Sequence, residues 1–286
     1  MQIRSVLSFI PFLLALLEAG AMRGQTIHGQ TMPPLKPTEK TVYDTAYVKV
    51  YYEYSYRPDS MSAARKSGQT ILLIGDKARG FMDYYDNTTD FVNDSLCAAR
   101  RSPQEAFMAL SRFMGKSTYS QPLVIDHSRN LVIMQMKSVN TYQYTQPMPE
   151  LKWTLADADT TVCDVACKKA TCRFGGREWT AWYAPSFPIA AGPYLFGGLP
   201  GLIFDIRDTK DNFHFSLNGL ENLNAGAPVY LRSAKLIPLT RDKARKAVEN
   251  VQSDIYRAFQ LANPNVQFGP HGGDNGKRPY NPIELE

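Results

Sequence analysis

The sequence predicts an α+β fold, a mostly antiparallel β-sheet with a short internal helix and a C-terminal helix docked on the sheet. Three observations support this class. Apolar and polar residues alternate along one long segment, pairs of apolar runs flank short turn sequences, and two segments repeat apolar residues at helical spacing. With 286 residues, of which 44% are hydrophobic, the chain can bury a sizeable core in a single domain.

The alternation is clearest between residues 42 and 56. In this segment Val48, Val50, Tyr52, Tyr54 and Tyr56 share one register, so their side chains fall on one face of a strand. Further along the chain, short turn sequences separate pairs of runs with strand character. We expect hairpins from residues 69–74 with 78–85, 123–126 with 131–136, 167–174 with 177–183, and 202–207 with 213–220.

Two segments carry helix signals. Ser102-Pro-Gln-Glu105 is a capping box with proline at the first helical position, and the run that follows ends at Gly115. A second helix begins near Thr240 and ends before Pro264, because proline cannot continue a helix. Its apolar residues recur on one face, which we expect to pack on the sheet; they are Ala244, Ala247, Val248, Val251, Ile255 and Phe259.

The segment from Gly198 to Ile203 predicts a tight turn with a structural role. Proline has the φ that the second position of a type II turn requires, and the glycine after it supplies the positive φ of the third position. The apolar residues that follow indicate a strand leaving the turn. The six residues of this signature turn are Gly198, Leu199, Pro200, Gly201, Leu202 and Ile203.

The chain divides into four parts, a signal peptide at residues 1–21, a flexible leader at 22–40, one domain at 41–268 and a Gly/Pro/Asn-rich tail at 269–286. Arg4 precedes an apolar run that is shorter than the roughly 20 residues needed to cross a bilayer, and Ala19-Gly-Ala21 fits a cleavage site. No cysteine for lipid attachment follows closely. The sequence therefore predicts export to the periplasm or beyond, with no transmembrane segment in the mature chain.

The charge balance argues against nucleic acid as a partner. The net charge is +5, and Asp242 and Glu249 interrupt the densest basic group, at residues 241–246 and beyond. Nucleic-acid binding requires a basic stripe on one face of the molecule. The basic residues here fit the solvated face of the second helix instead.

The four cysteines favour disulfide bonds in an exported protein. Zinc sites usually match such cysteines with a second pair or with histidines, and no histidine lies near them in the sequence. The pairing stays open, because four cysteines allow three connectivities. The disulfide candidates are Cys97, Cys163, Cys167 and Cys172.

The common catalytic and nucleotide-binding motifs are absent from the sequence. It therefore predicts no cofactor and favours a binding protein. An enzyme whose site the fold assembles from groups such as Arg177 and Asp205 stays open as an alternative. Aromatic side chains with polar tips are typical of binding surfaces, and the candidate ligand-binding residues are Trp179, Trp182, Tyr183 and Tyr194.

Met134 and Met136 support a different alternative, copper handling in the periplasm. Thioether sulfur suits Cu(I), and a spacing of two residues in a strand places both side chains on one face. Two core methionines would show the same spacing. The sequence favours core packing and leaves the metal as an alternative.

Between Trp153 and Glu221 a specific set of positions stands out: Trp153, Cys167 to Ala170, Phe174, Gly176-Arg177, Trp179, Ala181 to Tyr183, Pro188-Ile189, Gly192-Pro193, the signature turn and Gly219. On these positions the segment resembles the GLPGLI family, exported proteins of Gram-negative bacteria without an established biochemical function. The resemblance implies export and supplies no catalytic residues. Curved sheets covered by helices are used by periplasmic lipid and lipoprotein carriers, and this analogy of fold leads us to expect a non-enzymatic binding module of the cell envelope, whose partner is an apolar or peptide-like ligand or an envelope protein.

Overall fold

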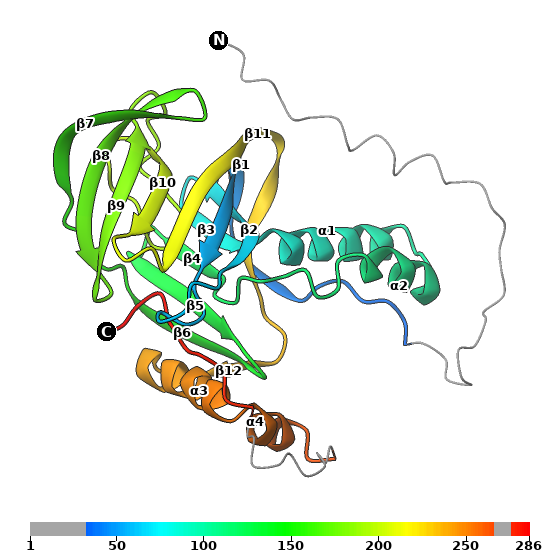
Figure 1. The fold of residues 1–286 in the computed structure, drawn as a ribbon. Helices are drawn as coiled ribbons and strands as arrows, with labels where there is room; N and C mark the ends of the chain where they lie inside the picture. Colours follow the sequence, from blue (N-terminus) through cyan, green and yellow to red (C-terminus); the bar gives the residue numbers. More distant parts are fainter. Residues whose placement is uncertain (1–32, 266–275) are drawn as a thin grey trace.

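The computed structural model describes residues 33–265 and 276–286. The strands in these residues form one twelve-stranded sheet in the order β12-β6-β5-β4-β3-β2-β1-β11-β10-β9-β8-β7 (Figure 1). Neighbouring strands run antiparallel except β12 and β6, which are parallel. Four short helices accompany this sheet in the described chain, which confirms the predicted α+β class. The predicted signal peptide lies outside the described residues.

The order of elements along the chain interleaves the helices with the strands. The bounds are β1 (Lys40–Tyr56), β2 (Lys66–Gly75), β3 (Ala78–Asp83), α1 (Tyr84–Ala98), α2 (Pro103–Ser111), β4 (Leu123–Asp126), β5 (Leu131–Lys137), β6 (Thr141–Pro147), β7 (Thr154–Val162), β8 (Val165–Phe174), β9 (Arg177–Ala184), β10 (Leu202–Asp208), β11 (Phe213–Arg232), β12 (Leu236–Pro238), α3 (Arg241–Ser253) and α4 (Ile255–Ala262).

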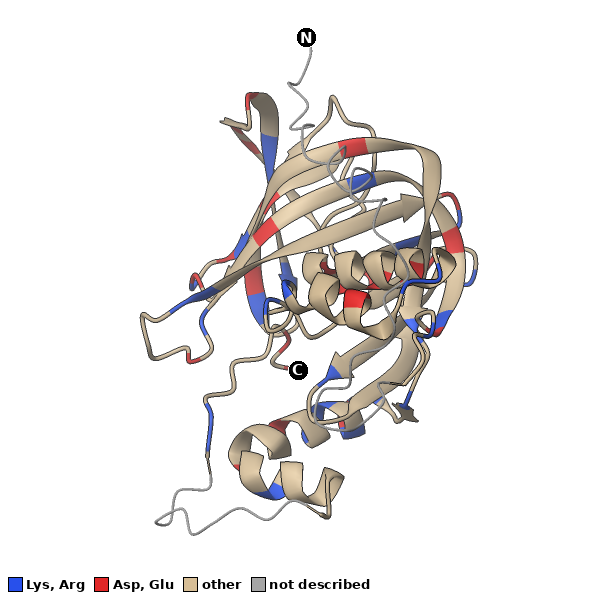
Figure 2. Ribbon diagram, turned by 90° about the vertical axis from the view of Figure 1, so that its right-hand side faces the viewer, with Lys and Arg blue, Asp and Glu red and all other residues tan. Residues whose placement is uncertain are grey.

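The centre of the sheet is the long antiparallel pair of β1 and β11, which runs from Lys40 opposite Arg232 to Tyr56 opposite Phe213. Register shifts interrupt this ladder at three points, and such irregularities bend and twist a strand. The sheet is accordingly curved (Figure 2). The alternation predicted for β1 is confirmed, because the buried residues of this strand are Ala46, Val48, Val50, Tyr52 and Tyr54.

The curvature lets strands from both ends of the sheet share one large core. Side chains of β1 to β6, β8 to β11 and α3 meet in this core, together with the loop that contains the signature turn. Alternate residues of the same central strands point to the other face, where Ile71, Leu73, Val124 and Ile133 belong to a smaller core. Tyr84 of α1 packs against that smaller core. The two helices α1 and α3 therefore lie on different faces of the sheet (Figure 1).

The helices depart from the sequence expectations in three ways. The capping box at Ser102 forms as predicted, with both reciprocal hydrogen bonds, but α2 ends at Ser111. The predicted C-terminal helix is divided at Asp254, whose side chain caps α4. The helix α1 was not predicted, because it is polar and begins where the expected strand at 78–85 should continue. Asp83 starts it by accepting hydrogen bonds from the amides of Tyr85 and Asp86.

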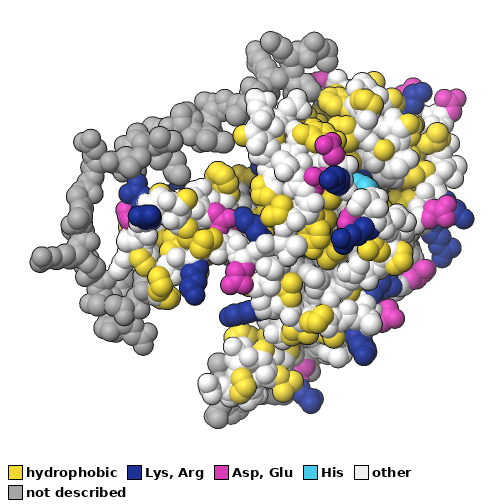
Figure 3. Space-filling view, turned by 180° about the vertical axis from the view of Figure 1, so that it is seen from behind, with side chains coloured by type: hydrophobic (Ala, Val, Ile, Leu, Met, Phe, Trp, Pro, Cys, Tyr) yellow, Lys and Arg dark blue, Asp and Glu magenta, His cyan; other side chains and the backbone are white. Residues whose placement is uncertain are grey.

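Helices α1 and α2 project from the sheet and expose several large apolar side chains (Figure 3). Phe91 of α1, Phe107 and Met108 of α2, and Met114 just after α2 are all more than half exposed. Of the helices in residues 33–265 and 276–286, none has the length and apolar content needed to cross a membrane.

The described part of the C-terminal tail is an ordered layer on the sheet. Arg177 of β9 donates hydrogen bonds to the carbonyls of Pro282 and Ile283 and to the side chain of Asn281. The Leu285 amide donates to the Gly175 carbonyl, 2.7 Å away. These contacts fix residues 281–285 across the hairpin of β8 and β9. The segment thereby becomes available as the wall of a pocket.

Candidate ligand-binding pocket

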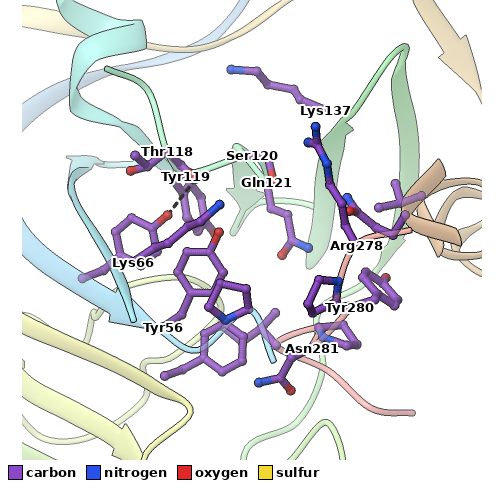
Figure 4. A pocket seen from close by; sticks show the side chains of 18 of the residues that line it. Tyr56, Lys66, Thr118, Tyr119, Ser120, Gln121, Lys137, Arg278, Tyr280 and Asn281 are labelled. Atoms are coloured by element: carbon purple, nitrogen blue, oxygen red, sulfur yellow. Dashed lines mark hydrogen bonds between the residues drawn. The ribbon is translucent and has the colours of Figure 1, made fainter. Parts of the chain in front are cut away.

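A pocket of about 480 Å³ opens where the β1–β11 pair, the loop before β4, helix α3 and the C-terminal segment meet (Figure 4). This volume falls in the range of about 300–1,000 Å³ that is typical of small-molecule sites. The lining residues come from distant parts of the chain: Tyr54, Tyr56, Pro58, Lys66, Thr118, Tyr119, Ser120, Gln121, Lys137, Phe213, Phe215, Val248, Gln252, Arg278, Pro279, Tyr280, Asn281, Pro282 and Ile283.

Aromatic rings form the apolar wall of the pocket. The register of β1 and β11 places Tyr54 opposite Phe215 and Tyr56 opposite Phe213, with ring centroids 5.8 and 5.9 Å apart. Tyr54 and Tyr56 stack on each other at 5.7 Å. Two residues of spacing along a strand keep these rings on one face. Tyr54, Phe213 and Phe215 are buried, so the half-buried Tyr56 is the ring of this stack that is most open to the pocket.

Tyr119 contributes a buried hydroxyl to this wall. Its ring packs edge-on against Tyr54 and Phe81, and the side chain is 6% exposed. Asp83 fixes the loop at this point by accepting hydrogen bonds from the amides of Thr118 and Tyr119, both 2.9 Å away. Among the described residues, the Tyr119 hydroxyl has no hydrogen-bond partner. The aspartate that starts α1 therefore also positions an unpaired hydroxyl in the pocket.

The Tyr119 hydroxyl is a donor at any physiological pH. Burial, with added repulsion from Tyr54 and Glu284, raises its pKa well above the ordinary value of tyrosine. The group therefore stays protonated. A buried donor without an acceptor costs about 1–3 kcal/mol. Because the Tyr119 oxygen is closed to solvent, an acceptor from outside the protein could pair with it only if the wall around it moves.

The charged groups of the pocket are all basic. Lys66 lies on one side of the opening, and Lys137 and Arg278 lie on the other (Figure 4). Lys137 forms an ion pair with Asp86. In the described chain, neither Lys66 nor Arg278 has a carboxylate within ion-pair distance. No aspartate or glutamate belongs to the lining, so its net charge is positive.

The four aromatic residues that the sequence proposed for ligand binding lie elsewhere. Trp179 is fully buried, and its indole N–H donates to the Phe174 carbonyl at 3.0 Å. Tyr183 and Tyr194 are also core residues, and the Tyr194 hydroxyl bonds to Glu284. Trp182 is half-buried, with the Lys169 ammonium 5.9 Å from the centre of its ring. None of the four lines the pocket. Alternation in β9 separates the faces as expected, but the face of Trp179 and Tyr183 is core.

The signature turn is tighter than the predicted type II turn. The Gly201 amide donates to the Leu199 carbonyl at 2.8 Å, which closes a three-residue turn around Pro200. Gly201 has a φ of 156°, and a Cβ at this position would lie 2.3 Å from the carbonyl oxygen of Ala184. Close backbone approach thus requires glycine there. Gly198 has a φ of 83° with open space around it.

A buried arginine holds the loop that leads into this turn. Arg79 of β3 is 3% exposed, and its guanidinium donates to the Phe196 carbonyl at 3.0 Å and, at longer range, to the carbonyls of Ala190 and Leu195. Burial lowers the pKa of Arg79 to about 10. The loop therefore depends on a charge without a carboxylate partner. Leu199, Leu202 and Ile203 are buried beneath it.

The predicted disulfides do not form: all four cysteines are free thiols in the structure. Cys97 lies on α1, which follows β3 near the middle of the strand order. The other three cysteines lie on the β7–β8 hairpin at one end of the sheet. Cys167 and Cys172 belong to one strand, where five residues span about 16 Å. A disulfide needs Cα atoms within about 7 Å. Cys163 sits on the turn, with its sulfur 3.2 Å from the Leu217 carbonyl.

Met134 and Met136 lie in the core. They are 1% and 4% exposed on one face of β5, as their spacing predicts, and they belong to the large core of the sheet. In the described residues, no group of three or more histidine, cysteine, aspartate or glutamate side chains is arranged to hold a metal ion. The burial of the two methionines accords with core packing.

Comparisons with known proteins support an uncharacterised family over part of the chain. A family described as "Protein of unknown function (Porph_ging)" matches residues 134–205, a stretch that includes the signature turn. The GLPGLI name and an envelope location receive no separate support from this match. No curated protein matches the chain.

Similarity to solved structures is distant. "Structure of PNGF-II in P21 space group" matches with a TM-score of 0.47 and 10% identity, over 72% of this chain and 33% of that chain. "Structure of PNGF-II in C2 space group" gives a TM-score of 0.45 and 10% identity, over 71% of this chain and 32% of that chain. The chain thus spans about a third of the length of these proteins. At this level the likeness carries no functional argument.

Proposed function

We propose that the protein is an exported, non-enzymatic binding module whose pocket takes a small ligand with an apolar ring or chain and a hydrogen-bond acceptor. The observation that carries the proposal is the buried, protonated Tyr119 hydroxyl without a partner among the described residues. An acceptor on the ligand would pair this group. The stacked rings of β1 and β11 would cover the apolar part of the same ligand.

The lining supports binding over chemistry. Acid–base catalysis uses a group that gains and loses a proton near neutral pH, most often histidine or a perturbed carboxylate. The residues that line the pocket include no histidine, cysteine, aspartate or glutamate. The lining can bind a small molecule, and it lacks the side chains that most often act as general acids or bases.

Export is part of the proposal on the strength of the sequence alone. Residues 1–21 have the basic start, short apolar run and small-residue cleavage site of a secretory signal. Fractionation tests this part directly. The mature protein should be released by osmotic shock without detergent, and its N-terminal sequence should begin near residue 22. Retention in washed membranes would contradict export in soluble form.

The binding proposal is tested with N-phenyl-1-naphthylamine, a neutral aromatic probe whose fluorescence increases in apolar sites. Wild-type protein should bind it saturably. Ser120→Trp should abolish that binding, because Ser120 lines the pocket and a large side chain would fill it. Ser117→Trp is the matched control, since Ser117 is exposed and does not belong to the lining. Equal binding by the two variants, or no binding by wild type, would overturn the proposal.

A further inference from the structure

The charge of the pocket narrows the class of ligand. Three basic residues and no acidic residue line the pocket. Lys137 pairs with Asp86, while Lys66 and Arg278 are exposed side chains. They face the same pocket and have no carboxylate partner in the described chain.

The acidic groups closest to the pocket are already engaged. Asp86 pairs with Lys137. Asp83 accepts the amide hydrogens of Thr118 and Tyr119 and caps α1. Glu284, behind the C-terminal wall, bonds to Tyr194 and to Arg241. None of these carboxylates is free to neutralise Lys66 or Arg278.

The position of Arg278 is fixed by the backbone. Its amide donates to the Gln252 carbonyl at 2.7 Å, which attaches the C-terminal segment to the end of α3. Its exposed side chain lies at the mouth of the pocket, opposite Lys66 (Figure 4). Tyr119, whose hydroxyl stays protonated, belongs to the same lining. The polar groups named here are all donors, while the sheet face is aromatic.

We propose, building on the binding function above, that the ligand is an amphiphilic anion: an apolar ring or chain against the rings of β1 and β11, with a carboxylate, sulfate or phosphate between Lys66 and Arg278. An anion has acceptor oxygens for both cations and for Tyr119. A neutral apolar molecule would leave the two charges unmatched. A cation would be repelled.

The test compares two probes that share one ring system. N-phenyl-1-naphthylamine is neutral, and 8-anilinonaphthalene-1-sulfonate carries an added sulfonate. Wild-type protein should bind the sulfonate more tightly, and the preference should shrink as salt screens the charges. Lys66→Gln and Arg278→Gln should each weaken sulfonate binding by about two- to fivefold, as expected for exposed charge pairs. Neither change should alter binding of the neutral probe.

Lys243→Gln is the matched control, because Lys243 is an exposed lysine of α3 outside the lining. It should leave binding of both probes unchanged. If wild type binds the two probes equally, or if Lys66→Gln and Lys243→Gln behave alike, the inference about charge is wrong and the binding function stands. If the neutral probe fails to bind as well, the proposed function itself fails.

Discussion

Tyr119 is a residue at which stability and binding are expected to conflict. Its hydroxyl is buried and unpaired among the described residues, while its ring packs against Tyr54 and Phe81. Tyr119→Phe keeps the ring and removes the unpaired group. We expect the free protein to become more stable by about 1 kcal/mol, measured by urea denaturation, and to bind 8-anilinonaphthalene-1-sulfonate more weakly. A stability loss would mean that the hydroxyl has a partner in solution.

The cysteines differ in how readily they should react. Burial raises the pKa of Cys167 to about 11 and that of Cys172 to about 12, and both side chains are inaccessible. Cys163 is exposed, although partial burial and the charges of Asp164 and Asp205 raise its pKa as well. Only the thiolate reacts, so labelling of the native protein at Cys163 should accelerate as the pH rises toward 9.

Thiol labelling checks this order. Cys163→Ser should remove the most accessible thiol of the native protein and leave only the partly exposed Cys97, and the unfolded wild type should take up four labels without prior reduction. Fewer labels before reduction would show that a disulfide had formed. An unchanged native signal in Cys163→Ser would place the reactive thiol elsewhere.

At the scale of elements, one carboxylate ties three strands together. Asp44 of β1 accepts hydrogen bonds from the amides of Lys77 and Ala78, at 2.6 and 2.9 Å, in the turn between β2 and β3. Although partial burial raises the pKa of Asp44, these bonds and one from Thr45 outweigh it and hold the pKa below the ordinary value. The ionised form is therefore the one that stabilises the fold.

Asp44→Ala should lower the free energy of unfolding by about 1 kcal/mol at pH 7. Because the folded-state pKa is depressed, the contribution is complete above about pH 4 and is lost as the pH falls through the folded-state value. The difference between wild type and variant should shrink accordingly when denaturation is repeated near pH 3. Asp76→Ala, in the same turn but exposed, should show neither effect.

The two glycines of the signature turn should differ in how well they tolerate a side chain. Gly198→Ala meets no neighbour and should cost about 1–2 kcal/mol for the positive φ alone. Gly201→Ala should cost more, because its Cβ would collide with the backbone of Ala184. Gly201→Asn should be no milder than Gly201→Ala, because asparagine places a Cβ at the same position. Thermal melting of the three variants tests this order, and a mild Gly201→Asn would contradict it.

These turns and helices show which elements a sequence can predict. The strands at 42–56, 123–126 and 202–207 were found because their alternation or apolar runs are local signals. A proline followed by glycine fits both a type II turn and the three-residue turn observed here, so the sequence predicts the wrong turn type. The contact of Gly201 with the Ala184 backbone is a tertiary feature that the local sequence does not contain. Helix α1 was missed because its apolar stripe is weak and its start depends on Asp83, a residue buried by tertiary contacts.

At the scale of the whole molecule, Arg177 joins the sheet to the pocket wall. It pairs with Asp208 at 3.2 Å and bonds to the segment at 281–283 while remaining almost fully buried. Arg177→Met should destabilise the protein by about 3–5 kcal/mol, because it leaves Asp208 without its charge partner. Binding of N-phenyl-1-naphthylamine should weaken even under conditions where the variant is folded.

Arg173→Met provides the control for Arg177→Met, since Arg173 lies on the neighbouring strand β8 and is exposed. It should change neither urea denaturation nor probe binding. If Arg177→Met folds and binds the probe like wild type, the C-terminal segment does not depend on Arg177 for its position.

The sequence alone did not predict the candidate site. The alternation of tyrosines in β1 and the apolar character of the tail around Tyr280 were visible, but nothing local relates them. Trp179 and Tyr194 carry the same chemical signal as Tyr56 and Tyr280, yet the fold buries the first pair in the core and leaves the second pair half-buried in the pocket lining. Residue type indicates what a side chain can do, and only the tertiary arrangement decides whether a ligand can reach it.

The pocket can form only late in the synthesis of the chain, because its two walls come from segments that lie far apart in the sequence. One wall belongs to β1, among the first described residues to be made, and the facing wall belongs to residues 278–283, among the last. A growing chain can pair β1 with β2 and β3 early, but the cavity has no second side until those final residues have emerged. Retention of a ligand would therefore report that the chain has been synthesised at least through residue 283 and that these two segments have folded together.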